Sequence, residues 1–218
     1  MNRSFILLLF FTASLPLYSQ SIPMTAKNFD PVNVTMEEVT YKSQKALRVI
    51  ETDFNKDRGA IAKDVQFTDG TIEVEVAGKP LPNANAGSRG FIGIAFRVTD
   101  NDTLRYDCFY LRPTNGRADD QIRRNHSTQY IAHPAYPWYR LRKEFPEMYE
   151  SYIDLVEGEW TKIKIVVKGK QVRLYVHGAD QPALIVNMLL GTETNGGVAL
   201  WVGQGTDGYF RNLKITRD

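Results

Sequence analysis

Hydrophobic and polar residues alternate along much of the chain with the two-residue period of a half-buried β-strand. The clearest case is residues 71–76, where Ile72, Val74 and Val76 alternate with polar positions. The same period recurs at residues 160–167 and 172–176, and the Lys168-Gly169-Lys170 run between them predicts a β-hairpin. Further strands are predicted at residues 46–51, 91–98, 105–111, 184–187, 198–202 and 209–216.

Two of these segments, residues 91–96 and 198–202, are apolar at both odd and even positions. Strands that are covered on both faces have this pattern, so both segments are predicted to be central strands, and Trp201 in the second is predicted to be structural. No segment shows a long helical period with caps, and no solenoid or propeller repeat occurs. About ten strands without interleaved helices predict an all-β fold, an antiparallel two-sheet β-sandwich of the jelly-roll type.

Residues 112–155 interrupt the alternation. This stretch is rich in proline and aromatic residues and lacks a regular period, although a short strand fits around residues 128–131. A long irregular insertion in a compact domain is usually functional or disordered, and so many aromatic rings argue against disorder. We therefore expect an ordered insertion that folds over one face of the sandwich and forms the wall of a groove.

The first 21 residues differ in character from the rest. Arg3 precedes an apolar run at residues 6–11, and the small residues Ser19 and Ser21 follow it, which is the layout of a secretory signal peptide. The apolar stretch contains Pro16 and is shorter than the ~20 residues that a membrane span needs. We expect a secreted or periplasmic protein without a membrane span, in which residues 22–218 form a single β-sandwich domain.

Composition narrows the possible partners. Lys+Arg 27 against Asp+Glu 25 leaves a formal net charge of +2, so no nucleic-acid partner is predicted. One cysteine, Cys108, excludes an internal disulfide framework and a cysteine-based zinc cluster, and its apolar neighbours predict burial. No cofactor is predicted. The run Asp100-Asn101-Asp102 fits a structural calcium site but is more typical of an ordinary turn.

Side chains suited to sugar recognition concentrate in residues 112–155. A sugar has apolar faces and a rim of hydroxyls, so its site combines flat rings with groups that form paired hydrogen bonds. The arginine excess of this stretch also fits acidic sugars, such as uronates or sulfated glycans. Alternatively, Arg–Asp pairs fasten the insertion to the sandwich and its rings form a local core. The predicted sugar-binding residues are Arg112, Asn115, Arg124, Asn125, Tyr130, Tyr136, Trp138 and Arg142.

Candidate catalytic residues lie in the same stretch. A glycoside hydrolase needs two carboxylates, and the candidates are Asp119, Asp120, Glu144, Glu147, Glu150 and Asp154. Adjacent aspartates on a strand point to opposite faces, so one of them with Glu150 is the better pair. A lyase instead needs a base and a group that neutralises a uronate carboxylate. His126 and Tyr130 are candidate bases and His133 is a second option, while Asn125 and the neighbouring arginines could neutralise the carboxylate.

The C-terminal third resembles a known superfamily. The runs that carry the resemblance are Gly158-Glu159-Trp160, Gly169-Lys170-Gln171-Val172-Arg173-Leu174, Gly196-Gly197-Val198-Ala199-Leu200-Trp201 and Phe210-Arg211-Asn212-Leu213-Lys214-Ile215. With residues 88–97, they are similar to strand and hairpin motifs of the concanavalin A-like lectin/glucanase superfamily, and most similar to the secreted bacterial 3-keto-disaccharide hydrolase type domain. The resemblance spans about residues 71–215 without the insertion, and it implies a secreted, glycan-handling sandwich.

Three functions are therefore open. The first is a secreted carbohydrate-active protein that binds a glycan in a groove and hydrolyses or eliminates it. The second is a glycan-binding module without catalysis, which requires ring faces but no carboxylate pair or base. The third is an adhesion domain of the laminin G type, which requires an exposed apolar patch for a protein partner.

Overall fold

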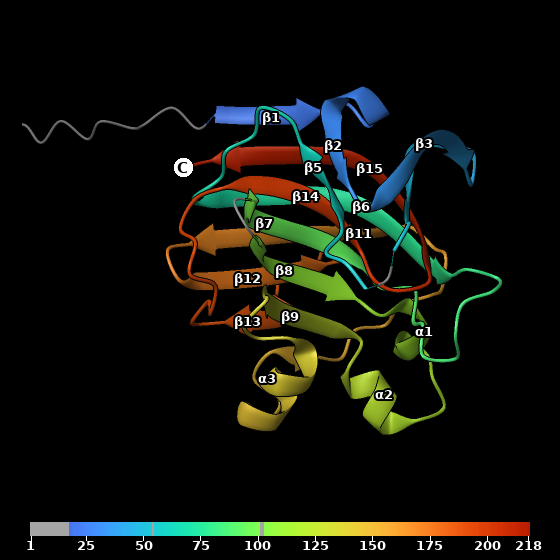
Figure 1. Cartoon of the computed structure of the whole chain (residues 1–218). Helices are drawn as coiled ribbons and strands as arrows, with labels where there is room; N and C mark the ends of the chain where they lie inside the picture. The colour runs from blue at the N-terminus through green and yellow to red at the C-terminus, as the bar shows by residue number, and fades with distance from the viewer. Residues whose placement is uncertain (1–17, 54, 101–102) are drawn as a thin grey trace, which may run out of the picture.

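Alternating apolar residues build an eight-stranded antiparallel sheet. The computed structural model describes residues 18–53, 55–100 and 103–218. The strand order is β13-β12-β11-β6-β15-β4-β3, and β1 also pairs with β15 (Figure 1). The strands are β1 (Tyr18–Ile22), β3 (Val34–Tyr41), β4 (Gln44–Glu51), β6 (Gly70–Pro80), β11 (Thr161–Lys168), β12 (Gln171–Val176), β13 (Leu184–Val186) and β15 (Thr206–Arg217).

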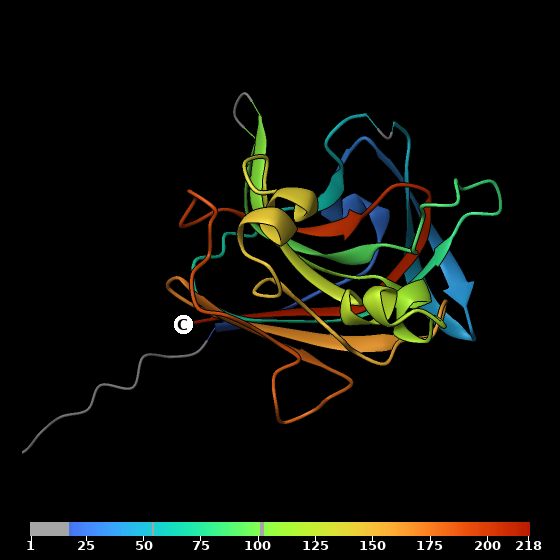
Figure 2. The same cartoon turned by 90° about the horizontal axis from the view of Figure 1, so that it is seen from below.

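A seven-stranded antiparallel sheet packs against the first, and Figure 2 shows the two layers from below. Its order is β10-β9-β8-β7-β14-β5-β2. The strands are β2 (Phe29–Val32), β5 (Gly59–Ala62), β7 (Ile92–Asp100), β8 (Leu104–Leu111), β9 (Thr128–His133), β10 (Glu150–Ser151) and β14 (Gly197–Val202). A short 3-10 helix, Ala26–Asn28, precedes β2. The predicted all-β, two-sheet sandwich is confirmed.

The sequence pattern located most of the central strands. Strand β7 lies in the middle of its sheet beside β14, as the apolar runs predict. The predicted hairpin joins β11 and β12, with Lys168 opposite Gln171. Strands β2, β3 and β5 were not predicted, because they lie at or near sheet edges and are short or bury few of their side chains.

The core lies between the sheets. Residues of one parity on each strand point inward, as Ile72, Val74 and Val76 do on β6. From the other sheet they meet large rings such as Phe96 and Phe109, which stack with their centroids 6.3 Å apart. Cys108 is fully buried as predicted, and burial raises the pKa of its thiol well above the usual value.

The segment 112–155 is more regular than the sequence predicted. It holds the helices α1 (Pro113–Gly116), α2 (Gln121–Asn125) and α3 (Trp138–Glu144), and it adds β9 and β10 to the seven-stranded sheet. Strand β9 includes the short strand expected around residues 128–131. Figure 1 shows α2 and α3 beside this edge of the sandwich. Short helices of four to seven residues escape a search for long helical periods.

Two predictions fall partly outside the described residues. Residues 1–17 of the predicted signal peptide lie outside them, whereas Tyr18–Ile22 forms β1 and pairs with β15. This strand begins at Tyr18, before the predicted domain start at residue 22, and a boundary at Ser21 would remove most of it. Of the candidate calcium run, residues 101 and 102 lie outside the described part. Among the described helices, none is long and apolar enough to cross a membrane.

Tyr130, predicted to bind sugar, faces the core instead. Its hydroxyl donates a hydrogen bond to Asp107 and accepts one from the Leu190 amide, and its side chain is fully buried. Asp107 also accepts a hydrogen bond from the Gly191 amide at 3.1 Å, while its second carboxylate oxygen is buried without a partner among the described residues. Burial raises the Asp107 pKa to about 6, although Tyr130, Gly191 and Arg97 oppose the shift.

This buried carboxyl predicts a pH-dependent stability. In the unfolded chain Asp107 titrates near 3.8, so between about pH 4 and 6 the unfolded state loses its proton first, and stability falls as pH rises. We expect the substitution Asp107→Asn to remove this loss. The free energy of unfolding of the variant, relative to that of the wild type, should therefore rise by ~3 kcal/mol between pH 4 and pH 7.

The measurement is urea denaturation at several pH values. The control Asp30→Asn changes an exposed strand residue that pairs with Lys63, and its difference from the wild type should not vary in this way. A difference between Asp107→Asn and the wild type that is constant with pH would contradict the assignment.

Candidate functional site

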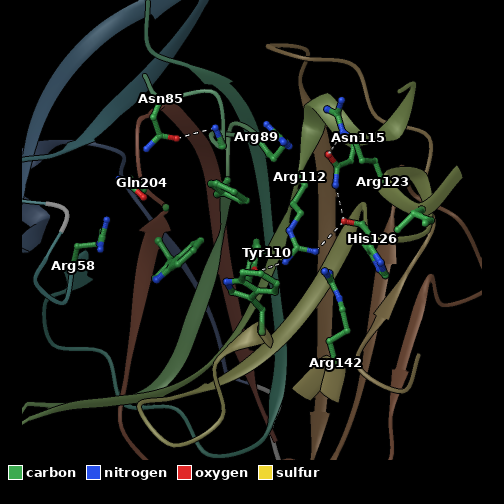
Figure 3. Close-up of a pocket in the computed structure, with 16 residues that line it drawn as sticks. Arg58, Asn85, Arg89, Tyr110, Arg112, Asn115, Arg123, His126, Arg142 and Gln204 are labelled. Atoms are coloured by element: carbon green, nitrogen blue, oxygen red, sulfur yellow. Dashed lines mark hydrogen bonds between the residues drawn. The ribbon is translucent and has the colours of Figure 1, made fainter. Parts of the chain in front are cut away.

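A pocket of about 520 Å³ opens on the outer face of the seven-stranded sheet, at the end where β7 begins and β8 and β14 end (Figure 3). The loop before β7, the loop after β14 and the segment 112–142 surround it. The lining residues are Arg58, Asn85, Gly87, Arg89, Phe91, Tyr110, Arg112, Asn115, Ile122, Arg123, His126, Trp138, Arg142, Trp201, Gly203 and Gln204.

The floor of the pocket consists of two rings on either side of a glycine. Gly93 on β7 lies opposite Tyr110 on β8 and Trp201 on β14. The two ring centroids are 4.8 Å apart, above the position that lacks a side chain. A Cβ atom on Gly93 would lie 2.0 Å from the Phe109 carbonyl oxygen, so the strands approach this closely only with glycine there. The three central strands thereby hold a broad aromatic surface at this end of the sheet.

Further rings extend this surface. Phe91, just before β7, packs edge-on against Tyr110, with the two ring centroids 6.0 Å apart. Trp138 begins α3 and keeps 44% of its surface exposed. The guanidinium carbons of Arg142 and Arg112 lie 5.0 and 5.8 Å from the centre of the Trp138 ring. Positive charge and aromatic surface are therefore adjacent along the wall.

A buried carboxylate organises the arginines behind this wall. Glu150 accepts two hydrogen bonds from Arg142, at 3.1 and 2.7 Å, and lies 3.9 Å from the Arg112 guanidinium. The side chain of Arg112 is itself buried and donates to the Tyr110 hydroxyl at 2.8 Å and to the His126 carbonyl at 3.0 Å. Because Glu150 accepts hydrogen bonds from Arg142 and forms an ion pair with Arg112, it holds both guanidinium groups in place.

His126 lies at the edge of the same cluster. Its Nδ1 is 2.8 Å from a Glu150 oxygen, but the contact lacks the alignment of a hydrogen bond. Partial burial lowers the pKa of the imidazole, the Glu150 charge opposes this shift, and the Arg142 and Arg112 charges reinforce it. His126 therefore contributes a neutral ring to the pocket at neutral pH.

Two short helices carry the polar end of the pocket. Asp120 caps α2 by accepting the Arg123 amide at 3.1 Å, which places Arg123 in the pocket lining. Proline at its first position starts α1, which carries the buried Asn115. Asn115 in turn donates to the His126 carbonyl at 3.2 Å. The Asp120 cap and the proline that starts α1 are local features of the sequence, and they help to position Arg123 and Asn115 at the site.

The structure brings together five of the predicted site residues and separates the others. Arg112, Asn115, His126, Trp138 and Arg142 line the pocket. Glu150 lies behind them, and the rest lie outside the lining. These others are Asp119 and Asp120, which are exposed; Arg124, which bonds to the Tyr152 hydroxyl; Asn125, which bonds to Gln121; Tyr136, beneath Arg140; and Tyr130, in the core.

Sequence reasoning missed the half of the pocket that lies outside residues 112–155. Trp201 was predicted to be structural, but it points to the outer face and donates to the Tyr106 hydroxyl at 3.1 Å. A strand that is apolar at odd and even positions is predicted to be covered on both faces. This pattern does not reveal that one of the two faces is the floor of a pocket. Arg58, Asn85, Arg89 and Gln204 come from separate loops, and no local pattern marks them. Within the described part of the chain, no three His, Cys, Asp or Glu side chains form a group that could hold a metal.

Comparison with known proteins supports the fold and not a specific family. No family model and no curated protein matches the chain. Solved structures do match. The carbohydrate-binding module CBM66 from Bacillus subtilis has 13% identity and a TM-score of 0.57, over 86% of this chain and 95% of that one. The luminal domain of VIP36, solved with Ca²⁺ and Man3GlcNAc, has 9% identity and a TM-score of 0.54, over 91% and 88%.

A third similar structure is a Bacillus subtilis protein of unknown function with a galectin-like fold, at 9% identity and a TM-score of 0.54, over 88% of this chain and 90% of that one. The chain is therefore a β-sandwich of the galectin-like and concanavalin A-like type, and its structural neighbours include carbohydrate-binding domains. The more specific resemblance to 3-keto-disaccharide hydrolases is not confirmed by these matches.

The buried carboxylate gives a prediction about the wall. Replacing Glu150 with Gln leaves Arg112 and Arg142 close together without a counter-charge, so we expect unfolding to become easier by ~3 kcal/mol or more. Urea denaturation and thermal unfolding measure this loss. The control Asp154→Asn breaks an exposed ion pair with Arg117 in the same segment and should leave the transition unchanged. Equal stabilities of the two variants would show that Glu150 does not hold the wall.

Proposed function

We propose that the protein binds a glycan in the pocket on the outer face of the seven-stranded sheet. The observation that carries this proposal is the combination of an aromatic floor, Tyr110 and Trp201, with a rim of guanidinium and amide groups in one hollow. Sugar rings pack their C–H faces on aromatic rings and place their hydroxyls toward such donors. The carbohydrate-binding structural neighbours support the same proposal.

The geometry favours binding over hydrolysis. A glycoside hydrolase needs two carboxylates on either side of the scissile bond. Among the described residues, no aspartate or glutamate lines the pocket. Glu150 is 7% exposed and engaged by Arg142, while Asp119 and Asp120 are exposed outside the lining. Of the functions that the sequence left open, a glycan-binding module therefore fits this site best, and a glycoside hydrolase fits less well.

A laminin G-like adhesion surface is also less well supported. Such a surface needs a continuous apolar patch. The exposed apolar side chains at the pocket, Ile122 and Trp138, are accompanied by Arg123 and Arg142. Charged groups interrupt the apolar area at each side, which suits a polar ligand.

The location that fits this function is outside the cytoplasm. The charged, apolar and small-residue pattern at the N-terminus supports secretion or a periplasmic location. Extracellular glycans would then be accessible to the pocket.

Trp138 tests the proposal. We expect Trp138→Ala to weaken glycan binding by ~1–3 kcal/mol, because it removes one ring of the wall, and to leave the melting temperature nearly unchanged, because the side chain is exposed. Retardation in gels that contain polysaccharides identifies the ligand, and isothermal titration calorimetry measures the affinity.

Tyr152→Ala is the matched control. Tyr152 lies in the same segment, is similarly exposed at 42% and does not line the pocket, so its loss should not change the affinity. Equal losses in both variants, or none in either, would contradict the site. Release of reducing ends or of unsaturated uronates from the bound polysaccharide would contradict a purely binding function.

A further inference from the structure

Positive charge concentrates in the proposed glycan pocket. Arg58, Arg89, Arg112, Arg123 and Arg142 all line it, and no carboxylate of the described residues accompanies them. The whole chain is nearly neutral, with a formal net charge of +2. The pocket therefore differs in charge from the molecule around it.

Buried carboxylates behind the lining neutralise only part of this charge. Arg58 forms an ion pair with Glu51, and Arg112 and Arg142 share the single carboxylate of Glu150. Among the described residues these two carboxylates are fewer than the five guanidinium groups of the lining, and His126 is neutral at neutral pH. The pocket therefore keeps a net positive charge.

Two of the arginines have only neutral partners. Arg89 donates to the carbonyls of Ala86 and Ser88, at 2.6 and 2.9 Å. Arg123 donates to the side-chain oxygen of Asn115 at 3.4 Å and to the Thr114 carbonyl at 3.3 Å. Neither forms an ion pair with a carboxylate in the part of the chain that the structure describes.

These arginines lie close enough to repel one another. Burial lowers the pKa of Arg89, and the charges of Arg123 and Arg112 lower it further. The loop that carries Arg89 is fixed on α1, because the Thr114 amide donates to the Arg89 carbonyl at 3.3 Å. In Figure 3, Arg89, Asn115 and Arg123 gather at one end of the pocket, opposite Arg58 and Gln204. The fold thus holds unneutralised cations side by side.

We infer that the pocket binds a saccharide that carries a negative charge, a carboxylate or a sulfate ester. Its anionic group lies at the Arg89–Arg123 end, and its ring lies on the floor that Tyr110 and Trp201 form. Guanidinium groups pair with oxyanions through two parallel hydrogen bonds, and an anion there relieves the repulsion between the arginines. This inference rests on the proposed glycan-binding function and names the class of its ligand.

The same surroundings favour a charged sugar over a simple polyanion. The aromatic floor offers no partner to a bare anionic chain, but it packs against a pyranose or furanose face. The amide side chains of Asn85, Asn115 and Gln204 add donors and acceptors for hydroxyls. The pocket therefore recognises ring and charge together.

The test compares polysaccharides that share a backbone and differ in charge. The probes are polygalacturonate against its fully methyl-esterified form, and κ-carrageenan against its desulfated form. Levan, arabinan and mannan are further neutral glycans, and polyglutamate is a carboxylate polymer without sugar rings. We expect one anionic member to bind at least about tenfold more tightly than its neutral counterpart, with an affinity that falls as NaCl is raised. The first pair detects recognition of a carboxylate and the second that of a sulfate.

The variants Arg89→Gln and Arg123→Gln assign the effect to the pocket. Each should weaken binding of the anionic probe by about tenfold or more, since each removes a charged donor. Arg117→Gln makes the same change of charge at an exposed position outside the lining and should leave binding unchanged. Circular dichroism and the melting temperature establish that each variant is folded.

The outcomes separate this inference from the proposed function. Binding of a neutral glycan as tight as that of its charged counterpart, or unaffected by Arg89→Gln and Arg123→Gln, overturns the inference and leaves glycan binding in place. Equal binding of polyglutamate overturns the recognition of a sugar ring. Failure of every polysaccharide to bind overturns both.

Discussion

The buried carboxylate of Glu150 is the interaction on which the site depends. It lies on the short strand β10 and accepts both hydrogen bonds of Arg142 from α3, while Arg112 reaches it from the end of β8. Burying a charge costs free energy unless it is paired, so these groups stabilise one another only in this arrangement. Arg112 in turn bonds to the Tyr110 hydroxyl of the floor and to the His126 carbonyl of the wall. One ionic cluster thus joins wall and floor.

The wall is also held by its own backbone. Ser127 bonds to both the carbonyl and the amide of Ile153, and Thr128 bonds to Ser151, so residues 127–128 and 151–153 lie side by side. At Gly116 the chain passes so near Leu155 that a Cβ would lie 2.3 Å from its nitrogen. A wall fixed at several points loses little conformational entropy on binding, which favours ligand affinity.

Rings and charges come from different parts of the fold for a physical reason. The floor lies on the central strands β7, β8 and β14, where burying an unpaired charge would be costly, so Gly93 and the rings of Tyr110 and Trp201 form it. Loops and helix ends border solvent and can carry arginines that lack acidic partners, as Arg89 and Arg123 do. The pocket combines both at the end of the sheet, where strands give way to loops.

The sequence by itself determined the sandwich and one wall of its pocket. A period of two residues needs only local information, and it located β6, β11 and β12 as well as the apolar run of β7, while the polar and aromatic segment 112–155 identified Arg112, Trp138 and Arg142. Tertiary structure decided which groups face one another. Tyr130 and Trp201 both lie in strands of the same sheet, yet strand register points Tyr130 at Asp107 in the core and Trp201 into the pocket. Arg89 and Arg123 are far apart along the chain, and only the docking of the loop before β7 on α1 places their charges together, because such a contact depends on three-dimensional packing that no local pattern encodes.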